Sequence, residues 1–238
     1  MVYRQLLGTN TVTSSSTTGS VTFGSAVPVG RLVVLCLVWS NDSTVIPTID
    51  TIADSRGNTY SVNSSAGTAN ATASCAIVSA PVSTALQSGD SVTVTLSSGR
   101  VRWCLQADEL GSVGAFDKPA SNHNPGSATS MSTGTTAATT YPSEVAVANW
   151  GWGRGGGATP TLDTASGWFG STYVTTAAGS TDRALQVAFR DLTATGTQSG
   201  TATLSVAAGY VGALATFTLL QAPVPDSPTR KQLHMRVR

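Results

Sequence analysis

The feature that most constrains the fold is an eight-residue run, residues 32–39, in which every residue is apolar and three are valine. Eight residues are far fewer than the roughly 20 that a membrane-spanning helix needs. Valine favours strands, because its branched side chain packs well on a pleated surface. A strand that is apolar on both faces has to be covered on both faces. We therefore predict a central, fully buried strand in a soluble, all-β protein.

Alternation of apolar and polar residues predicts further strands. Val92, Val94 and Leu96 alternate with threonines, and the pattern resumes over residues 101–107 after the turn-like stretch 97–100. Two alternating runs joined by a short turn that contains glycine predict a β-hairpin. Similar runs follow at residues 145–148, 185–189, 201–206 and 211–220. We expect about ten strands and no amphipathic helix.

The segments between these runs are rich in threonine, serine and glycine. One of them, residues 120–140, is long for a loop and is expected to be a surface excursion that touches a neighbour or a boundary between two β-halves. One body is favoured here, because neither half by itself is expected to supply two full sheets. The predicted fold is a single antiparallel β-sandwich of jelly-roll type over residues 1–222, followed by an extended basic C-terminal tail, residues 223–238.

Charge and cysteine content narrow the class of protein. Charged residues make up 11% of the 238, against a usual share of about 25%, and the net charge is +1. Such a surface suits coverage by neighbouring subunits or, alternatively, an exposed neutral β-protein. Cys36, Cys75 and Cys104 lie in or beside apolar runs, so we predict buried free thiols and assembly in a reducing compartment. No nucleic-acid or membrane partner is expected.

The tail combines charge with alternation. Three prolines, the last at position 228, prevent a helix or a strand ladder from continuing into it. Over residues 232–238 polar and apolar side chains alternate, which is the pattern that a strand added to a neighbour's sheet requires. We predict that residues 229–238 pair with another subunit. The predicted contact residues are Arg230, Leu233, Met235, Arg236, Val237 and Arg238.

A formal Gly-x-Gly-x-x-Gly occurs at residues 151–156. The dinucleotide fingerprint needs a helix directly afterwards, and Pro160 stands where that helix would continue. We therefore predict a flexible glycine loop that projects Trp152 and Arg154 towards a partner or a sugar. The alternative places Trp150 in the core, with Trp152 capping the end of its strand.

Catalytic chemistry has little support in the sequence. His123 lies in a segment expected to be a loop, and the only other histidine is in the tail. A hydrolase triad would have to use His123, and no Gly-x-Ser-x-Gly is present. Asp50, Asp54 and Asn58 offer oxygen ligands without the spacing of a calcium loop. We predict no enzymatic activity, no metal and no cofactor.

Residues 54–60, Asp-Ser-Arg-Gly-Asn-Thr-Tyr, are the most specific motif. We expect a hairpin turn in which Asp54 accepts hydrogen bonds from nearby backbone and Gly57 supplies a positive φ. Tyr60 then returns to the sheet. The motif falls within a longer order of features: an apolar strand at 32–35, Trp39, the motif itself, a Gly-Ala-Phe-Asp segment at 114–117, a Thr-rich excursion, a strand at 144–150, a Ser-Gly-Trp turn at 166–168 and a final apolar strand.

This order resembles the β-sandwich virion proteins of tailed bacteriophages, which comprise minor tail proteins and capsid decoration proteins. The resemblance spans most of residues 20–220 as a pattern and does not include the basic tail. It implies a structural role in the virion, in the tail in preference to the capsid, after assembly in the host cytoplasm. The implied partners are other virion proteins and copies of this chain. A capsid decoration protein is one alternative, and a module that binds carbohydrate, such as a host surface glycan, is another.

Overall fold

The computed structural model describes residues 4–40, 46–67, 73–100, 102–153, 157–170, 173–176 and 182–220. These residues form strands and one 3-10 helix, η1 (Thr164–Ser166). The strands of the first half are β1 (Arg4–Val12), β2 (Ser16–Thr22), β3 (Leu32–Ser40), β4 (Ile49–Asp54), β5 (Ser61–Ala66), β6 (Ala73–Pro81), β7 (Ser91–Arg100) and β8 (Trp103–Leu110). Those of the second half are β9 (Val113–Thr135), β10 (Glu144–Gly153), β11 (Pro160–Leu162), β12 (Phe169–Gly170), β13 (Val174–Thr175), β14 (Arg183–Leu192) and β15 (Ser199–Leu219).

The first eight strands form two facing antiparallel sheets. The first sheet has the order β1-β8-β3-β6-β5, and the second has the order β2-β7-β4. The expectation that neither half supplies two sheets is therefore wrong for the first half. The third sheet comes wholly from the second half, with the order β11-β15-β10-β14-β12; β9 pairs with β15, and β13 pairs with β14.

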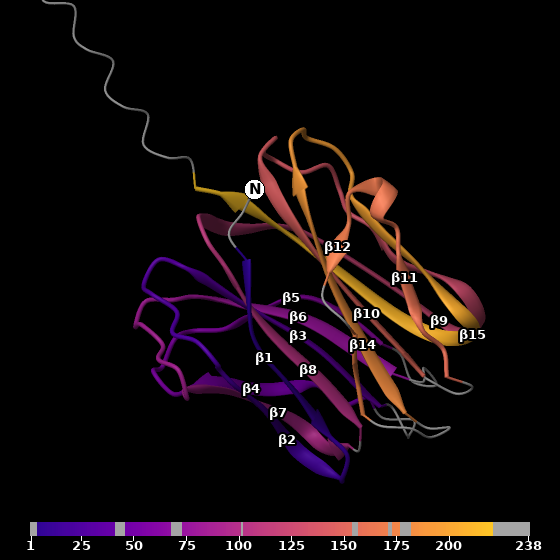
Figure 1. Ribbon diagram of the computed structural model, residues 1–238, viewed down its shortest axis with the longest axis horizontal. Coiled ribbons are helices and arrows are strands. Elements are labelled where there is room, and N and C mark those ends of the chain that lie inside the picture. The colour runs from indigo at the N-terminus through magenta and orange to yellow at the C-terminus, as the bar shows by residue number, and fades with distance from the viewer. Residues whose placement is uncertain are drawn as a thin grey trace, which may run out of the picture.

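The three sheets stack in layers, with the first sheet in the middle (Figure 1). Val33, Leu35 and Leu37 of β3 pack against the second sheet, in a core shared with β7. Val34, Cys36 and Val38 point the other way, into a core shared with β10, β14 and β15. The prediction of a fully buried central strand is thus confirmed, since all nine residues of β3 are buried. The layers on its two faces explain why its sequence is apolar without alternation.

The outer face of the third sheet carries a separate core. Trp150, Trp152 and Trp168 lie in it, together with Leu162 of β11 and with Leu204 and Tyr210 of β15. Trp150 and Trp168 make an edge-to-face contact with ring centroids 6.0 Å apart. This geometry suits the positive edge of one aromatic ring and the negative face of another.

The predicted hairpin across residues 97–100 is wrong. β7 pairs with β2 and β4, whereas β8 pairs with β1 and β3, so the chain passes from the second sheet to the first between them. Arg102 takes a φ of 64° at this crossing, in the left-handed region that few residues other than glycine adopt. The alternation identified both strands correctly, but alternation reports which faces are buried and not which strand is the neighbour.

The prediction that residues 120–140 form a loop is wrong for residues 120–135, because these residues belong to β9. In the described structure β9 pairs with β15 alone, so its other edge accommodates Pro119 and Pro125 without losing ladder hydrogen bonds. His123 accordingly lies on an exposed strand and not in a loop. The polar, Pro-containing composition that suggested a loop belongs to an edge strand. Edge strands of this kind, together with strands of only two or three residues, raise the number of described strands to fifteen, against the roughly ten predicted.

All three cysteines are free and buried, as predicted. Burial raises the pKa of Cys36 well above its usual value and raises that of Cys75 and that of Cys104 to about 12. Because the thiolate is the reactive form, these side chains are inert in the folded protein.

Candidate functional site

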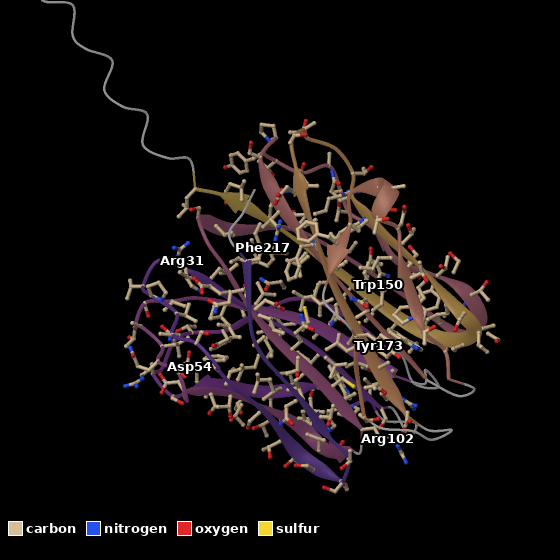
Figure 2. The ribbon with its side chains drawn as sticks, viewed as in Figure 1. Arg31, Asp54, Arg102, Trp150, Tyr173 and Phe217 are labelled. Atoms are coloured by element: carbon tan, nitrogen blue, oxygen red, sulfur yellow. The ribbon has the colours of Figure 1, made fainter. Side chains whose placement is uncertain are left out.

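The Trp-Gly-Trp segment predicted to project towards a partner lies in strand β10. Trp152 is fully buried, its Nε1 donates to the carbonyl oxygen of Ala158 at 3.2 Å, and its ring contacts Tyr173. The prediction that Trp152 contacts a partner is therefore wrong, because alternation along β10 turns Trp150 and Trp152 into the outer core. Figure 2 shows Trp150 and Tyr173 within the second half. Arg154 lies outside the described residues.

The predicted contacts of the C-terminal tail, Arg230, Leu233, Met235, Arg236, Val237 and Arg238, also lie outside the described residues, which end at Leu220. Of the acidic residues considered for a metal, Asp54 has a structural role instead, described below. No group of three or more His, Cys, Asp or Glu side chains among the described residues is arranged to hold a metal ion.

The 54–60 motif forms the turn that its residues predict. Asp54 accepts from the backbone N–H groups of Arg56, at 2.9 Å, and Asn58, at 3.1 Å, and Gly57 has a φ of 75°. The Tyr60 hydroxyl donates to Asp54 at 3.1 Å. Burial, reinforced by the nearby Asp54 carboxylate, raises the pKa of Tyr60. The turn chemistry and the positive φ are confirmed.

The motif is nevertheless a corner and not a hairpin. β4 lies in the second sheet and β5 in the first, so the turn carries the chain from one sheet to the other. The buried Asn58 side chain secures this corner to the loop after β6: its oxygen accepts from the backbone N–H groups of Ser83 and Thr84, each at 2.9 Å. Its amide nitrogen donates to the Thr84 carbonyl at 3.0 Å. Asp54 marks the outer side of the first half in Figure 2.

An apolar hollow opens on the side of the first half where β4 and β5 part; we call it the β4 slot. It has a volume of about 270 Å³ and is lined by Trp39, Ile46, Pro47, Thr48, Ile49, Val62, Ser65, Ala66, Gly67 and Ser74. Val62 is 48% exposed at its rim. The indole nitrogen of Trp39 is buried there and has no hydrogen-bond partner among the described residues.

The strand order explains why the slot exists. β4 pairs with β7 along one edge, and no described strand pairs with its other edge. β5, the next strand along the chain, joins β6 in the first sheet instead of lying beside β4. Among the described strands, β4 is therefore the last strand of the second sheet on this side. An unpaired strand edge beside an apolar hollow presents backbone donors and acceptors together with a place for side chains.

A second hollow, which we call the aromatic pocket, lies where the described chain ends. Its volume is about 660 Å³, and it is lined by Ala115, Phe116, Asp117, Thr140, Tyr141, Pro142, Ser143, Thr218 and Leu219. Phe116 and Tyr141 are both exposed. The pocket thus offers two aromatic rings and several hydroxyl groups around one carboxylate.

Asp117 is held charged in this pocket. Desolvation acts against the charge, but hydrogen bonds from Thr140 and Lys118 outweigh it and lower the pKa of Asp117 to about 2. Thr140 donates through its backbone N–H at 2.7 Å and its hydroxyl at 2.6 Å, and the Lys118 ammonium lies 2.9 Å away. The neighbouring Glu144 has a raised pKa because it is buried. The carboxylate is therefore a fixed negative charge at neutral pH.

The sequence alone identified neither hollow. Ile49 and Val62 are ordinary members of strand patterns, and only the separation of β4 from β5 makes them the walls of a slot. For the aromatic pocket a signal did exist: Tyr141-Pro142 follows a Thr-rich stretch, and an aromatic residue beside proline in a polar segment suggests an exposed ring.

Neither a family model, nor a curated protein, nor a solved structure matches this chain. None of the helices in the described part of the chain is long and apolar enough to cross a membrane.

Proposed function

We propose that this protein is a non-enzymatic structural component of a tailed-phage virion, located in the tail and acting through subunit contacts. The observation that carries the proposal is the unpaired edge of β4 beside the apolar β4 slot. Native proteins usually cover or blunt such edges, because an open edge templates pairing with another chain. An edge left open beside an apolar hollow suits a subunit that is completed by its neighbours.

The strand order adds support. The run β1-β8-β3-β6 facing β2-β7-β4 is the order expected of a jelly roll in which the last strand of the second sheet has moved to the first. We infer that the first half is a jelly roll, an architecture found in viral capsid and lectin domains. Since many functions share one fold, this order favours a virion role without deciding it.

Within this proposal the partners are other virion proteins and copies of the chain. A capsid decoration protein is the alternative within the same class. The test is quantitative mass spectrometry of tails and heads purified separately from particles of the phage that encodes the chain. We expect the protein in the tail fraction at a fixed ratio to the major tail subunit. Enrichment in heads would favour decoration of the capsid, and absence from both fractions would refute the proposal.

The aromatic pocket favours one further candidate, the binding of a host surface glycan. Exposed aromatic rings stack on sugar faces, and Asp117 with the surrounding hydroxyls offers hydrogen-bond partners. A glycan array probed with the full chain tests this candidate. Tyr141→Ala should abolish any signal, whereas Val206→Ala, which removes an exposed side chain that does not line the pocket, should not. An array without signal, or equal loss in both variants, would exclude it.

A further inference from the structure

We propose that the β4 slot is an acceptor for the C-terminal segment of a second copy of this chain, residues 229–238, which adds to β4 as an extra strand. The inference rests on the proposed structural role and deepens it by naming both surfaces of the contact. Strand addition to an open sheet edge is an established mode of recognition, in which backbone hydrogen bonds supply affinity and pockets for alternate side chains supply specificity.

The acceptor has both parts that this mode requires. The outer edge of β4 lacks a described partner over the six residues of the strand. Directly beside it, Ile49 and Val62 line a hollow with the volume of a few methylene-rich side chains. Trp39 is one of the lining residues, and its buried indole nitrogen has no hydrogen-bond partner among the described residues, so it can donate to an occupant whose entry reaches it. A buried donor without an acceptor costs about 1–3 kcal/mol, so an occupant that supplies one is favoured.

The donor has the matching pattern. Leu233, Met235 and Val237 recur at a spacing of two residues, so an extended segment places all three on one face. Gln232 and His234 lie on the opposite face. Ten residues extend over roughly 33 Å, which exceeds the roughly 20 Å of a six-residue strand. The segment is therefore long enough to cover the whole edge of β4.

Charge also suits this pairing. None of the residues that line the slot is a lysine or an arginine, and Asp50 is exposed on β4 itself. Residues 230–238 carry four basic side chains, while the rest of the chain carries nine basic and twelve acidic ones. A basic segment is thus attracted to a mildly acidic body and meets no cation inside the slot.

The position of the slot favours a second copy over the same chain. Leu220 donates its backbone N–H to Ser112, close to the end of the first sheet where Leu110 pairs with Leu32. The slot lies at the other end of that sheet, beside Trp39, and on the opposite face from β15. Thirteen Cα–Cα steps lead from Leu220 to Leu233 and span about 45 Å when fully extended. That length would have to run along the sheet and around its edge, whereas the segment of a neighbour needs no detour.

Disulfide trapping between full-length chains tests the contact. One chain carries Val62→Cys and the other Leu233→Cys, and the native cysteines, which are buried and have raised pKa values, do not compete. The matched controls are Val29→Cys, at an exposed valine away from the slot, and Gln232→Cys, on the opposite face of the segment. We expect a mixed disulfide dimer that forms at least about ten-fold faster than either control pair, because docking raises the effective concentration of the two thiols.

Each outcome decides the matter. Equal rates in the test and control pairs would overturn the proposal. So would a disulfide within one chain carrying both substitutions that forms at a rate independent of protein concentration, since the occupant would then be the chain's own tail. If the protein is present in purified particles but shows no preferred cross-link, the slot proposal fails and the virion role stands. If the cross-link forms but the protein is absent from particles, the strand exchange stands and the virion role fails.

Discussion

Asp108 is a buried carboxyl group on β8, between the first and third sheets. Its neighbour Gln106 donates to it at 2.9 Å, yet burial raises the pKa of Asp108 to about 7. The native state therefore keeps a proton that the unfolded chain releases near pH 4. Because the native state binds more protons between these two values, the free energy of unfolding falls as pH rises from 4 to 7 and stays lower above 7.

Asp108→Asn should remove this dependence. Asparagine keeps an oxygen that can accept from Gln106 and carries no charge to bury. We expect the variant to be more stable than the wild type at pH 8 by up to about 4 kcal/mol, and about equally stable at pH 3, below the pKa of the unfolded chain. Urea unfolding at both pH values measures the difference. An identical pH dependence in both proteins would show that Asp108 is not buried as described.

At Gly57 the backbone conformation alone determines how much stability a substitution costs. Its φ is 75°, and no atom lies within 4 Å of the position that a β-carbon would take. Gly57→Val should therefore lower stability by about 1 kcal/mol or more through backbone strain, without any steric clash. Arg56→Ala in the same turn should have little effect on the melting temperature, because the Arg56 side of its ion pair with Asp90 is exposed to solvent. Equal effects would count against a left-handed residue at this corner.

At the scale of the elements, the close approach of β10 to β3 connects the two halves. Asn149 of β10 reaches across the core and donates to the carbonyl oxygens of Leu37, at 3.2 Å, and Ala76, at 2.9 Å. Two residues on, Gly151 leaves no room, since a β-carbon there would lie 2.5 Å from a Val38 methyl group. Gly151, the first glycine of the formal Gly-x-Gly-x-x-Gly, thus allows the third sheet to pack closely against the first.

Gly151→Ala should push the third sheet away from the first. We expect a loss of about 1–3 kcal/mol in the free energy of unfolding, the usual cost of overpacking a core. Val38→Ala alone should also destabilise, through the cavity that it leaves. Because the new methyl group occupies that cavity, the double variant should be more stable than the sum of the two losses predicts. Additive losses in a denaturant series would contradict the contact.

At the scale of the whole molecule, the three layers enclose every thiol. Cys36, Cys75 and Cys104 lie in the core between the first and third sheets. A thiol reagent should therefore react with all three only as fast as the layers separate, and the reaction should accelerate together with unfolding in denaturant. Rapid labelling of one cysteine under native conditions would mean that the third sheet detaches locally.

Deletion of residues 229–238 addresses the assembly directly. The truncated protein should keep the wild-type melting temperature, since the described members of the three cores all come before residue 220. It should fail to enter virions, as measured by mass spectrometry of purified particles. Normal incorporation would move the docking surface elsewhere on the molecule and leave the fold unaffected.

The sequence by itself determined which side chains are buried and how some turns form. The apolar run at β3 required cover on both faces, and Asp54 with Gly57 specified a turn, because these properties depend on neighbouring residues alone. Only the tertiary structure decided that β7 and β8 lie in different sheets, that β5 leaves one edge of β4 without a described partner, and that Trp152 is buried. Alternation specifies faces and leaves the pairing of strands open. Pairing follows from contacts between segments far apart in the chain, and those contacts created the β4 slot.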